Sequence, residues 1–236
     1  MWKSYKVFMK KWNRIEFYAF FPLFCIMIYA AVLIAWAPGL KSGELIHFFE
    51  VNSERTEANS FVILLSILPS IPFLLTDECS LGELFHGRNG SADFLRRSCK
   101  GKDVFLKAVI MDFLIRIAVF AFIFGGAVLA ETLIGAWHGF ELRSWSMRGT
   151  FFLLEVVTCS FAVTLAVTLG RMVTNMIVRF LFVYLGMGVA GFMTLQAWTN
   201  PWLILVMSIL SLLLTGISVG MAKWKWEENA RDDQRD

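Results

Sequence analysis

Three ionisable residues stand inside long apolar stretches of this chain, where a charge is costly unless it faces protein or water. Asp112 and Arg116 are four residues apart, so they share one face of a helix and can form an ion pair. Glu155 lies in the next apolar stretch, at a depth that allows contact with Arg116 across two antiparallel helices. We expect Arg116 and Glu155 to form a structural pair that holds the two helices together. The alternative is that one of these groups lines a path for a substrate or a proton.

Motifs of soluble enzymes are missing from the sequence. It contains no G-x-x-x-x-G-K-[ST] phosphate loop, no H-E-x-x-H and no G-x-S-x-G. His47, His86 and His138 fall in three different polar connections, which gives no ordinary spacing for metal ligands. We therefore predict a chain without a catalytic site, a metal or a cofactor of its own.

Six apolar blocks must position the three ionisable residues. They cover residues 17–37, 60–76, 104–130, 149–170, 176–197 and 202–222. Each is close to the about 20 residues with which a helix crosses about 30 Å of hydrocarbon. Hydrophobic residues make up 57% of the chain and aromatic residues 15%, well outside the averages of soluble proteins. The sequence predicts an all-α polytopic membrane protein with six transmembrane helices in a single domain, residues 1–236.

Lysine and arginine concentrate on alternate connections between the blocks. Basic residues are frequent in residues 1–16, 77–103 and 223–236 and sparse in the other connections. Because basic loops remain on the cytoplasmic side, both termini and the second connection are predicted to be cytoplasmic. The net charge of +3 follows this topology and indicates no nucleic-acid partner.

Local patterns refine this topology. Residues 1–16 place aromatic and basic residues at helical spacing, which predicts an interfacial helix before the first span. Pro69 and Pro72 predict a kink in the second span. Glycine pairs such as Gly125 and Gly126 indicate surfaces on which helices pack closely.

The second connection, residues 77–103, is the longest polar stretch and predicts a short amphipathic helix. This connection resembles that of the ABC-2 type permeases, the membrane subunits of one class of ATP-binding cassette exporters. In that family an amphipathic N-terminal helix precedes six spans, and the loop after span two runs from acidic residues through Gly and Leu to basic residues and Gly-Lys. The corresponding residues here are Asp77, Glu78, Gly82, Glu83, Leu84, Arg96, Arg97, Gly101 and Lys102.

The resemblance implies a transmembrane subunit that works with other chains. A separate ABC ATPase subunit, which binds ATP and Mg, would dock on the coupling residues of the loop, including Leu81 and Leu84. A second permease subunit, identical or closely homologous, would complete the pathway in the bacterial plasma membrane. The cargo implied is an apolar or amphipathic molecule such as a peptide, a bacteriocin or an antibiotic, moved out of the cell.

Two other functions are compatible with the same residues. An ion-coupled secondary transporter would use Asp112, Arg116 and Glu155 inside the membrane. A membrane scaffold would instead recruit a cytosolic partner to the basic loop and transport nothing.

Overall fold

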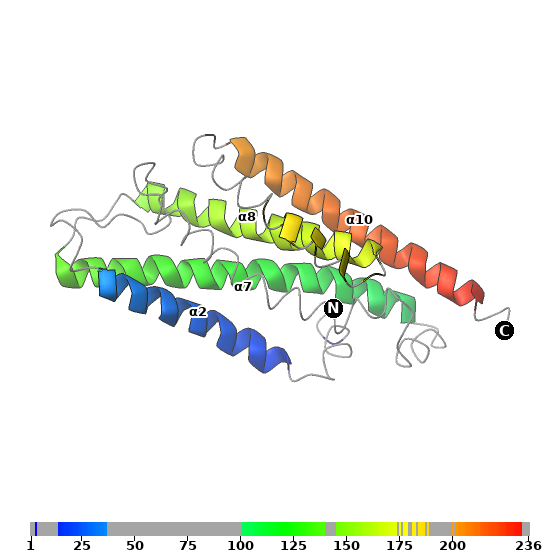
Figure 1. Ribbon diagram of the computed structural model, residues 1–236, viewed down its shortest axis with the longest axis horizontal. Coiled ribbons are helices and arrows are strands. Elements are labelled where there is room, and N and C mark those ends of the chain that lie inside the picture. The colour runs from blue at the N-terminus through cyan, green and yellow to red at the C-terminus, as the bar shows by residue number, and fades with distance from the viewer. Residues whose placement is uncertain are drawn as a thin grey trace.

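The computed structural model describes four ranges of the chain, residues 14–36, 101–139, 145–173 and 202–232, together with residues 3, 175, 177, 178, 181, 182, 184–186, 188 and 200. The four ranges form the helices α2 (Arg14–Trp36), α7 (Gly101–His138), α8 (Trp145–Met172) and α10 (Trp202–Asp232), shown in Figure 1. The predicted kink and residues 77–100 of the predicted coupling loop lie outside the described residues.

Three of these helices contain segments long and apolar enough to cross a membrane. The segments are Gly101–His138, Phe152–Met172 and Trp202–Glu228, and α2 contains a shorter apolar stretch, Phe20–Ala35. The prediction of an all-α, multi-pass membrane protein is therefore confirmed at this level. Of the two remaining apolar blocks, residues 60–76 are outside the described ranges and residues 176–197 are described only in part.

The helices are longer than the apolar blocks that predict them. The third block was placed at residues 104–130, whereas α7 extends from Gly101 to His138 and is followed by Gly139 with φ +70°. A glycine in this left-handed region is a common way for a helix to end. The predicted tail, residues 223–236, is helical as far as Asp232. Backbone hydrogen bonding continues past the apolar residues because it does not depend on side-chain hydropathy.

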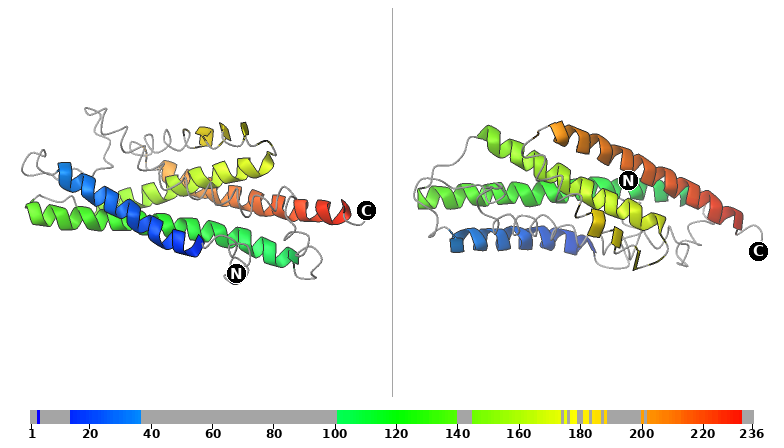
Figure 2. Two further views of the ribbon diagram at one scale, coloured as in Figure 1. Left: turned by 60° about the horizontal axis from the view of Figure 1, so that its bottom comes forward. Right: turned by 45° about the horizontal axis from the view of Figure 1, so that its top comes forward.

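Contacts between the helices fix their relative directions. Ile26 lies against Gly126, and Tyr29 bonds to Glu131, so α2 and α7 are parallel. Gly125 faces Phe152 whereas Asp112 lies near Arg171, so α7 and α8 are antiparallel. Figure 2 shows the same directions from two further sides.

The helix α10 is parallel to α8 and antiparallel to α7. Leu154 packs with Met207 and Arg171 bonds to Ser218, which fixes the first direction. Lys102, at the start of α7, contacts Glu227 near the end of α10. The beginnings of α2 and α7 and the ends of α8 and α10 therefore lie at one end of the bundle (Figure 1).

The core consists of three apolar clusters. Tyr29, Phe120 and Val163 belong to one that joins α2, α7 and α8. A second joins Phe105 of α7 to Ala222 of α10, and a third joins α8 to α10. The apolar segment of α8 has the largest buried share and that of α10 the smallest. Helix α7 packs against all three of the others, whereas the apolar segment of α8 is the most deeply buried of the three.

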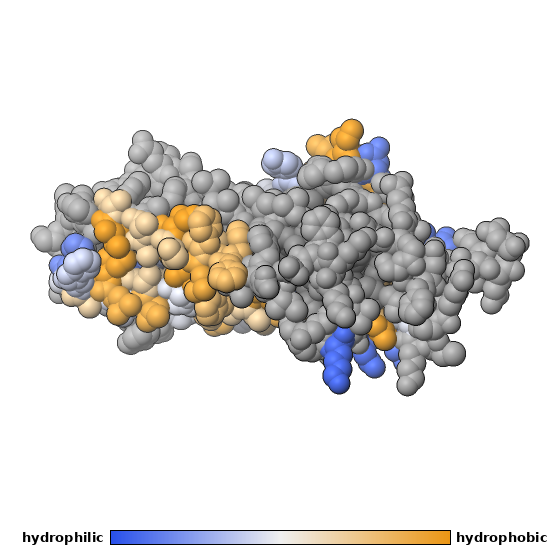
Figure 3. All heavy atoms as spheres, turned by 90° about the horizontal axis from the view of Figure 1, so that it is seen from below, coloured by the Kyte–Doolittle hydropathy of each residue, from blue (hydrophilic) through white to orange (hydrophobic). Residues whose placement is uncertain are grey.

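Large apolar side chains remain exposed outside this core. Figure 3 shows them gathered on the side of the molecule that α2 forms, where Phe20, Phe24 and Met27 are exposed. Exposed leucine and isoleucine side chains also cover α10. Such surfaces are stable in hydrocarbon, which agrees with the apolar segments found in three of the helices.

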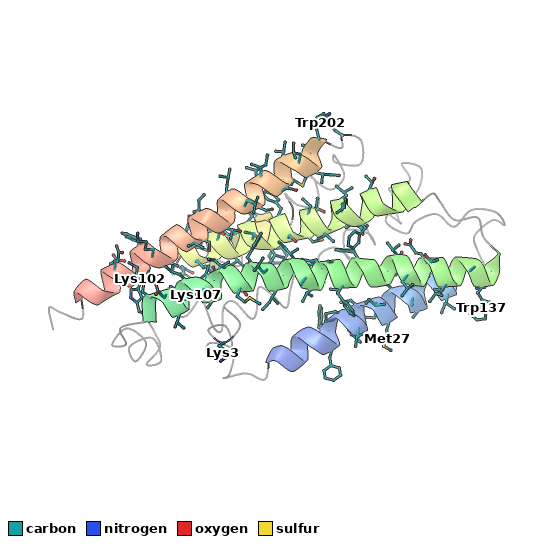
Figure 4. The ribbon with its side chains drawn as sticks, turned by 180° about the vertical axis from the view of Figure 1, so that it is seen from behind. Lys3, Met27, Lys102, Lys107, Trp137 and Trp202 are labelled. Atoms are coloured by element: carbon teal, nitrogen blue, oxygen red, sulfur yellow. The ribbon has the colours of Figure 1, made fainter. Side chains whose placement is uncertain are left out.

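Exposed tryptophans mark both ends of the bundle. Trp202 and Trp224 of α10 are exposed and 22 positions apart, which corresponds to about 33 Å along a helix. This separation matches the about 30 Å of a hydrocarbon core, and tryptophan is enriched at both membrane interfaces. Figure 4 places Lys102 and Lys107 at one end of α7 and Trp137 at the other. The basic end is the one that the sequence predicts to be cytoplasmic.

Candidate functional site

The predicted pair on α7 is present. Arg116 Nη2 donates a hydrogen bond to Asp112 Oδ2, one helical turn away, and only 3% and 5% of the two residues are exposed. Aspartate and arginine four residues apart meet on one helix face, so this contact is set by the sequence spacing. The prediction that Asp112 and Arg116 pair is confirmed.

A second arginine extends this pair to two further helices. Arg171, near the end of α8, is buried, and its Nη1 donates to Ser218 Oγ of α10 at 2.8 Å. Its Nη2 lies 3.5 Å from Asp112 Oδ2 of α7. We call Asp112, Arg116, Arg171 and Ser218 the three-helix junction. It joins α7, α8 and α10 in the half of the bundle nearest the basic end.

Arg171 was not predicted to be a junction residue, because the predicted block ends at residue 170 and Arg171 then falls in the connection that follows. In the structure α8 continues to Met172, and Val173 N then bonds to Gly170 O at 3.4 Å. A signal was present: Thr164, Thr168 and Arg171 follow one another at helical spacing, and all three are buried. A polar stripe of this kind on an apolar helix faces protein and not lipid.

The energetics of the junction follow from its burial. Charge-assisted hydrogen bonds are about twice as strong as neutral ones. Removing one member of a buried ion pair leaves an uncompensated charge, which costs far more than removing both members. The arrangement therefore holds the three helices together.

A second polar contact lies in the opposite half of the bundle. The hydroxyl group of Tyr29 on α2 donates to Glu131 Oε1 on α7, and both residues are buried. The sequence did not predict this pair. Glu131 directly follows the apolar block at residues 104–130, and Tyr29 lies inside the apolar block at residues 17–37. The bond connects two residues that are 102 positions apart in the sequence and so joins α2 to α7.

Removal of the Tyr29 hydroxyl tests this contact. We expect Tyr29→Phe to lower the free energy of unfolding by about 1.5–3 kcal/mol, the usual worth of a hydrogen bond to a charged group. Unfolding of the protein in mixed detergent micelles measures the change. Tyr184, which is exposed, provides the control, since Tyr184→Phe removes the same atom and is expected to have little effect. Equal effects of the two changes would contradict the role of Tyr29.

Glu155 is buried but does not take the partner that the sequence suggested. Only 2% of the residue is exposed, and within the described part of the chain neither carboxyl oxygen has a hydrogen-bond partner. The expected contact with Arg116 was therefore wrong. The register explains why: the contacts of Phe152 with Gly125 and of Arg171 with Asp112 place Glu155 about six to twelve residues, or about 9–18 Å, along α7 from the level of Arg116. Arg116 reaches Asp112 on its own helix instead.

Most residues of the predicted coupling loop lie outside the described ranges. These are Asp77, Glu78, Leu81, Gly82, Glu83, Leu84, Arg96 and Arg97. The last two motif residues, Gly101 and Lys102, form the first turn of α7. Lys102 Nζ bonds to Glu227 Oε1 at 2.5 Å, and the rings of Phe105 and Trp226 stack with centroids 5.7 Å apart. The end of the loop is thereby attached to the end of α10.

Among residues 14–36, 101–139, 145–173 and 202–232, no group of three or more His, Cys, Asp or Glu side chains is placed to hold a metal ion. Comparisons with known protein families, with curated proteins and with solved structures found no match to this chain.

Proposed function

We propose that this chain is the transmembrane subunit of an ABC exporter. A separate ATPase subunit hydrolyses ATP and drives the movement of an apolar or amphipathic cargo, such as a peptide, bacteriocin or antibiotic, out of the cell. Two permease subunits in the plasma membrane form the pathway. The proposal starts from the resemblance of residues 77–102 to the coupling loop of ABC-2 type permeases.

The directions of the four described helices support the predicted topology. In a six-span chain with cytoplasmic termini, spans one and three point outward, and spans four and six point inward. The structure has the same directions: α2 is parallel to α7, α8 is parallel to α10, and the two pairs are antiparallel to each other. The second and fifth apolar blocks then provide the two return crossings.

One observation carries the mechanical part of the proposal. The predicted coupling loop leads directly into α7, and α7 is fastened at this point to α10 through Lys102 with Glu227 and Phe105 with Trp226. A force that an ATPase applies to the loop therefore acts on two helices together. The exposed ion pair contributes little by itself. The stacked rings, which belong to a buried cluster, provide most of the attachment.

The three-helix junction extends this linkage to α8. Because Arg171 of α8 contacts both Asp112 and Ser218, displacement of α7 or α10 also displaces α8. Packed helices with such links move as bodies. Closure of the partner ATPases would thus tilt α7, α8 and α10 as a unit, and the resulting change in the pathway between the two permease subunits would favour cargo release on the other side.

Co-purification tests the proposal. The full chain is expressed with its genomic neighbours, extracted in mild detergent and recovered by an affinity tag, and bound proteins are identified by mass spectrometry. We expect a P-loop ATPase in stoichiometric amount. Arg96→Glu and Leu84→Ser are each expected to reduce its recovery at least tenfold, because both residues belong to the proposed docking loop.

The matched control for the charge reversal is Arg143→Glu, which lies in a connection predicted to face outward. Recovery of the ATPase with this variant should equal that of the unchanged protein. The proposal is contradicted if no P-loop protein is recovered, or if Arg96→Glu and Leu84→Ser leave both recovery and cargo export unchanged.

A further inference from the structure

Glu155 is a buried acid that the proposed exporter mechanism does not use. It lies on α8 with 2% of its surface exposed, and neither carboxyl oxygen has a hydrogen-bond partner among the residues that the structure describes. We propose that Glu155 is a proton-binding group in the core of the bundle, on a helix that packs against α7 and α10. The proposal goes beyond the exporter function and does not depend on it.

The surroundings of Glu155 bring acidic groups together. From α7, Glu131 acts on it electrostatically, and the hydroxyl of Tyr29 on α2 holds Glu131 in place. The titratable neighbour on α8 itself is Cys159, one turn away. Residues 202–222 of α10 contain no titratable side chain. The two arginines among the described spans, Arg116 and Arg171, bond to Asp112 in the other half of the bundle.

A proton is the ligand that this chemistry favours. An ionised carboxylate that is buried without donors costs several kcal/mol, whereas a neutral carboxylic acid costs much less to bury. A second carboxyl group nearby adds repulsion between like charges. A divalent cation would need more ligands, and the described ranges hold no group of three or more suitable side chains. Binding of one proton removes the charge without any further ligand.

The position of Glu155 gives it access to one side of the membrane. It lies ten residues, or about 15 Å, from the start of α8 at the end of the bundle opposite the basic residues. Gly149, Thr150 and Leu153 are exposed, and burial begins only at Leu154. Exchange of the proton with the outer solution therefore requires a displacement of this end of α8, which is the end nearer to Glu155.

Infrared spectroscopy of the full chain in lipid tests the proposal, because a protonated carboxyl group has a carbonyl stretching band that a carboxylate lacks. Ordinary glutamates, with a pKa of about 4.3, are ionised at about pH 7. We expect one protonated-carboxyl band at that pH, its loss in Glu155→Gln and its retention at a shifted frequency in Glu155→Asp. The band should shift in heavy water, since the proton exchanges with solvent.

Glu228→Gln is the matched control, since Glu228 lies in the polar end of α10 and bonds to Lys225. This variant should keep the band. The proposal is overturned if the unchanged protein lacks the band, if Glu155→Gln retains it, or if heavy water leaves its frequency unchanged. If Glu155→Gln does not fold, the frequency shift in Glu155→Asp decides the assignment. No ATPase is present in this measurement, so its outcome is separate from that of the co-purification experiment.

Discussion

Asp112→Asn should lower the free energy of unfolding by about 3–5 kcal/mol, the usual cost of removing one partner from a buried ion pair. The change keeps the size of the side chain but leaves Arg116 and Arg171 beside a neutral amide in the core of three helices. Arg171 keeps its bond to Ser218, whereas the carboxylate that both guanidinium groups contact is lost. Unfolding in mixed detergent micelles, followed by circular dichroism, measures the effect.

A double-variant cycle separates the ion pair from other effects of the substitution. Adding Arg116→Met to Asp112→Asn removes both charges of the helical pair, so we expect part of the lost free energy to return, while the buried charge of Arg171 stays uncompensated. Glu228→Gln removes a carboxylate from a partly exposed i,i+3 pair on α10, and we expect it to cost less than about 0.5 kcal/mol. If Asp112→Asn costs no more than this control, the three-helix junction does not hold the bundle together.

Gly126→Ala should separate α2 from α7. A Cβ atom at this position would lie 2.8 Å from Cγ1 of Ile26, closer than side-chain carbons approach in real structures. Because Cγ1 is bonded to Cβ of Ile26, relief of the clash requires either rotation of the whole Ile26 side chain or separation of the two helices. Overpacking of this kind costs about 1–3 kcal/mol. The expected result is a lower unfolding temperature, measured on the purified protein.

The adjacent residue, Gly125, provides a matched control on the same helix. A Cβ at Gly125 would lie 3.7 Å from Cε2 of Phe152, an ordinary van der Waals contact, so Gly125→Ala is expected to be tolerated. In an Ile26→Ala background, Gly126→Ala should lose most of its effect because the clashing atoms are gone. Equal destabilisation by the two glycine changes would show that helix propensity, and not contact with α2, determines the outcome.

The sequence predicted the existence of the described helices but not their full lengths. Apolar blocks report the part of a helix that meets hydrocarbon, so Gly101–Asp103 and Glu131–His138 of α7 fell outside the predicted span. For the same reason residues 223–232 were predicted to belong to a polar tail. They are helical, and Trp226 packs against Phe105 of α7. Hydropathy carries no information on contacts beyond the membrane, and these define both ends of the bundle.

In the candidate site, contacts within one helix could be predicted from the sequence, whereas contacts between helices could not. Asp112 and Arg116 belong to one helix, and their spacing alone determines that they meet. The partners of Arg171 and Glu131 depend on which faces of α2, α8 and α10 point inward and on their register, which a single sequence does not encode in a readable way. For the same reason the expected contact between Arg116 and Glu155 failed: depth was inferred from the block boundaries, and an error of a few residues exceeds the reach of a side chain.

Cysteine accessibility tests the central claim, that the segment preceding α7 lies in the cytoplasm and the opposite end of α7 faces outward. In a variant without Cys25, Cys79, Cys99 and Cys159, single cysteines are introduced by Ser91→Cys and His138→Cys, and intact cells are treated with a membrane-impermeant maleimide. We predict labelling at position 138 in intact cells and at position 91 only after permeabilisation. Labelling of position 91 in intact cells would place the proposed docking loop outside the cell and contradict the account.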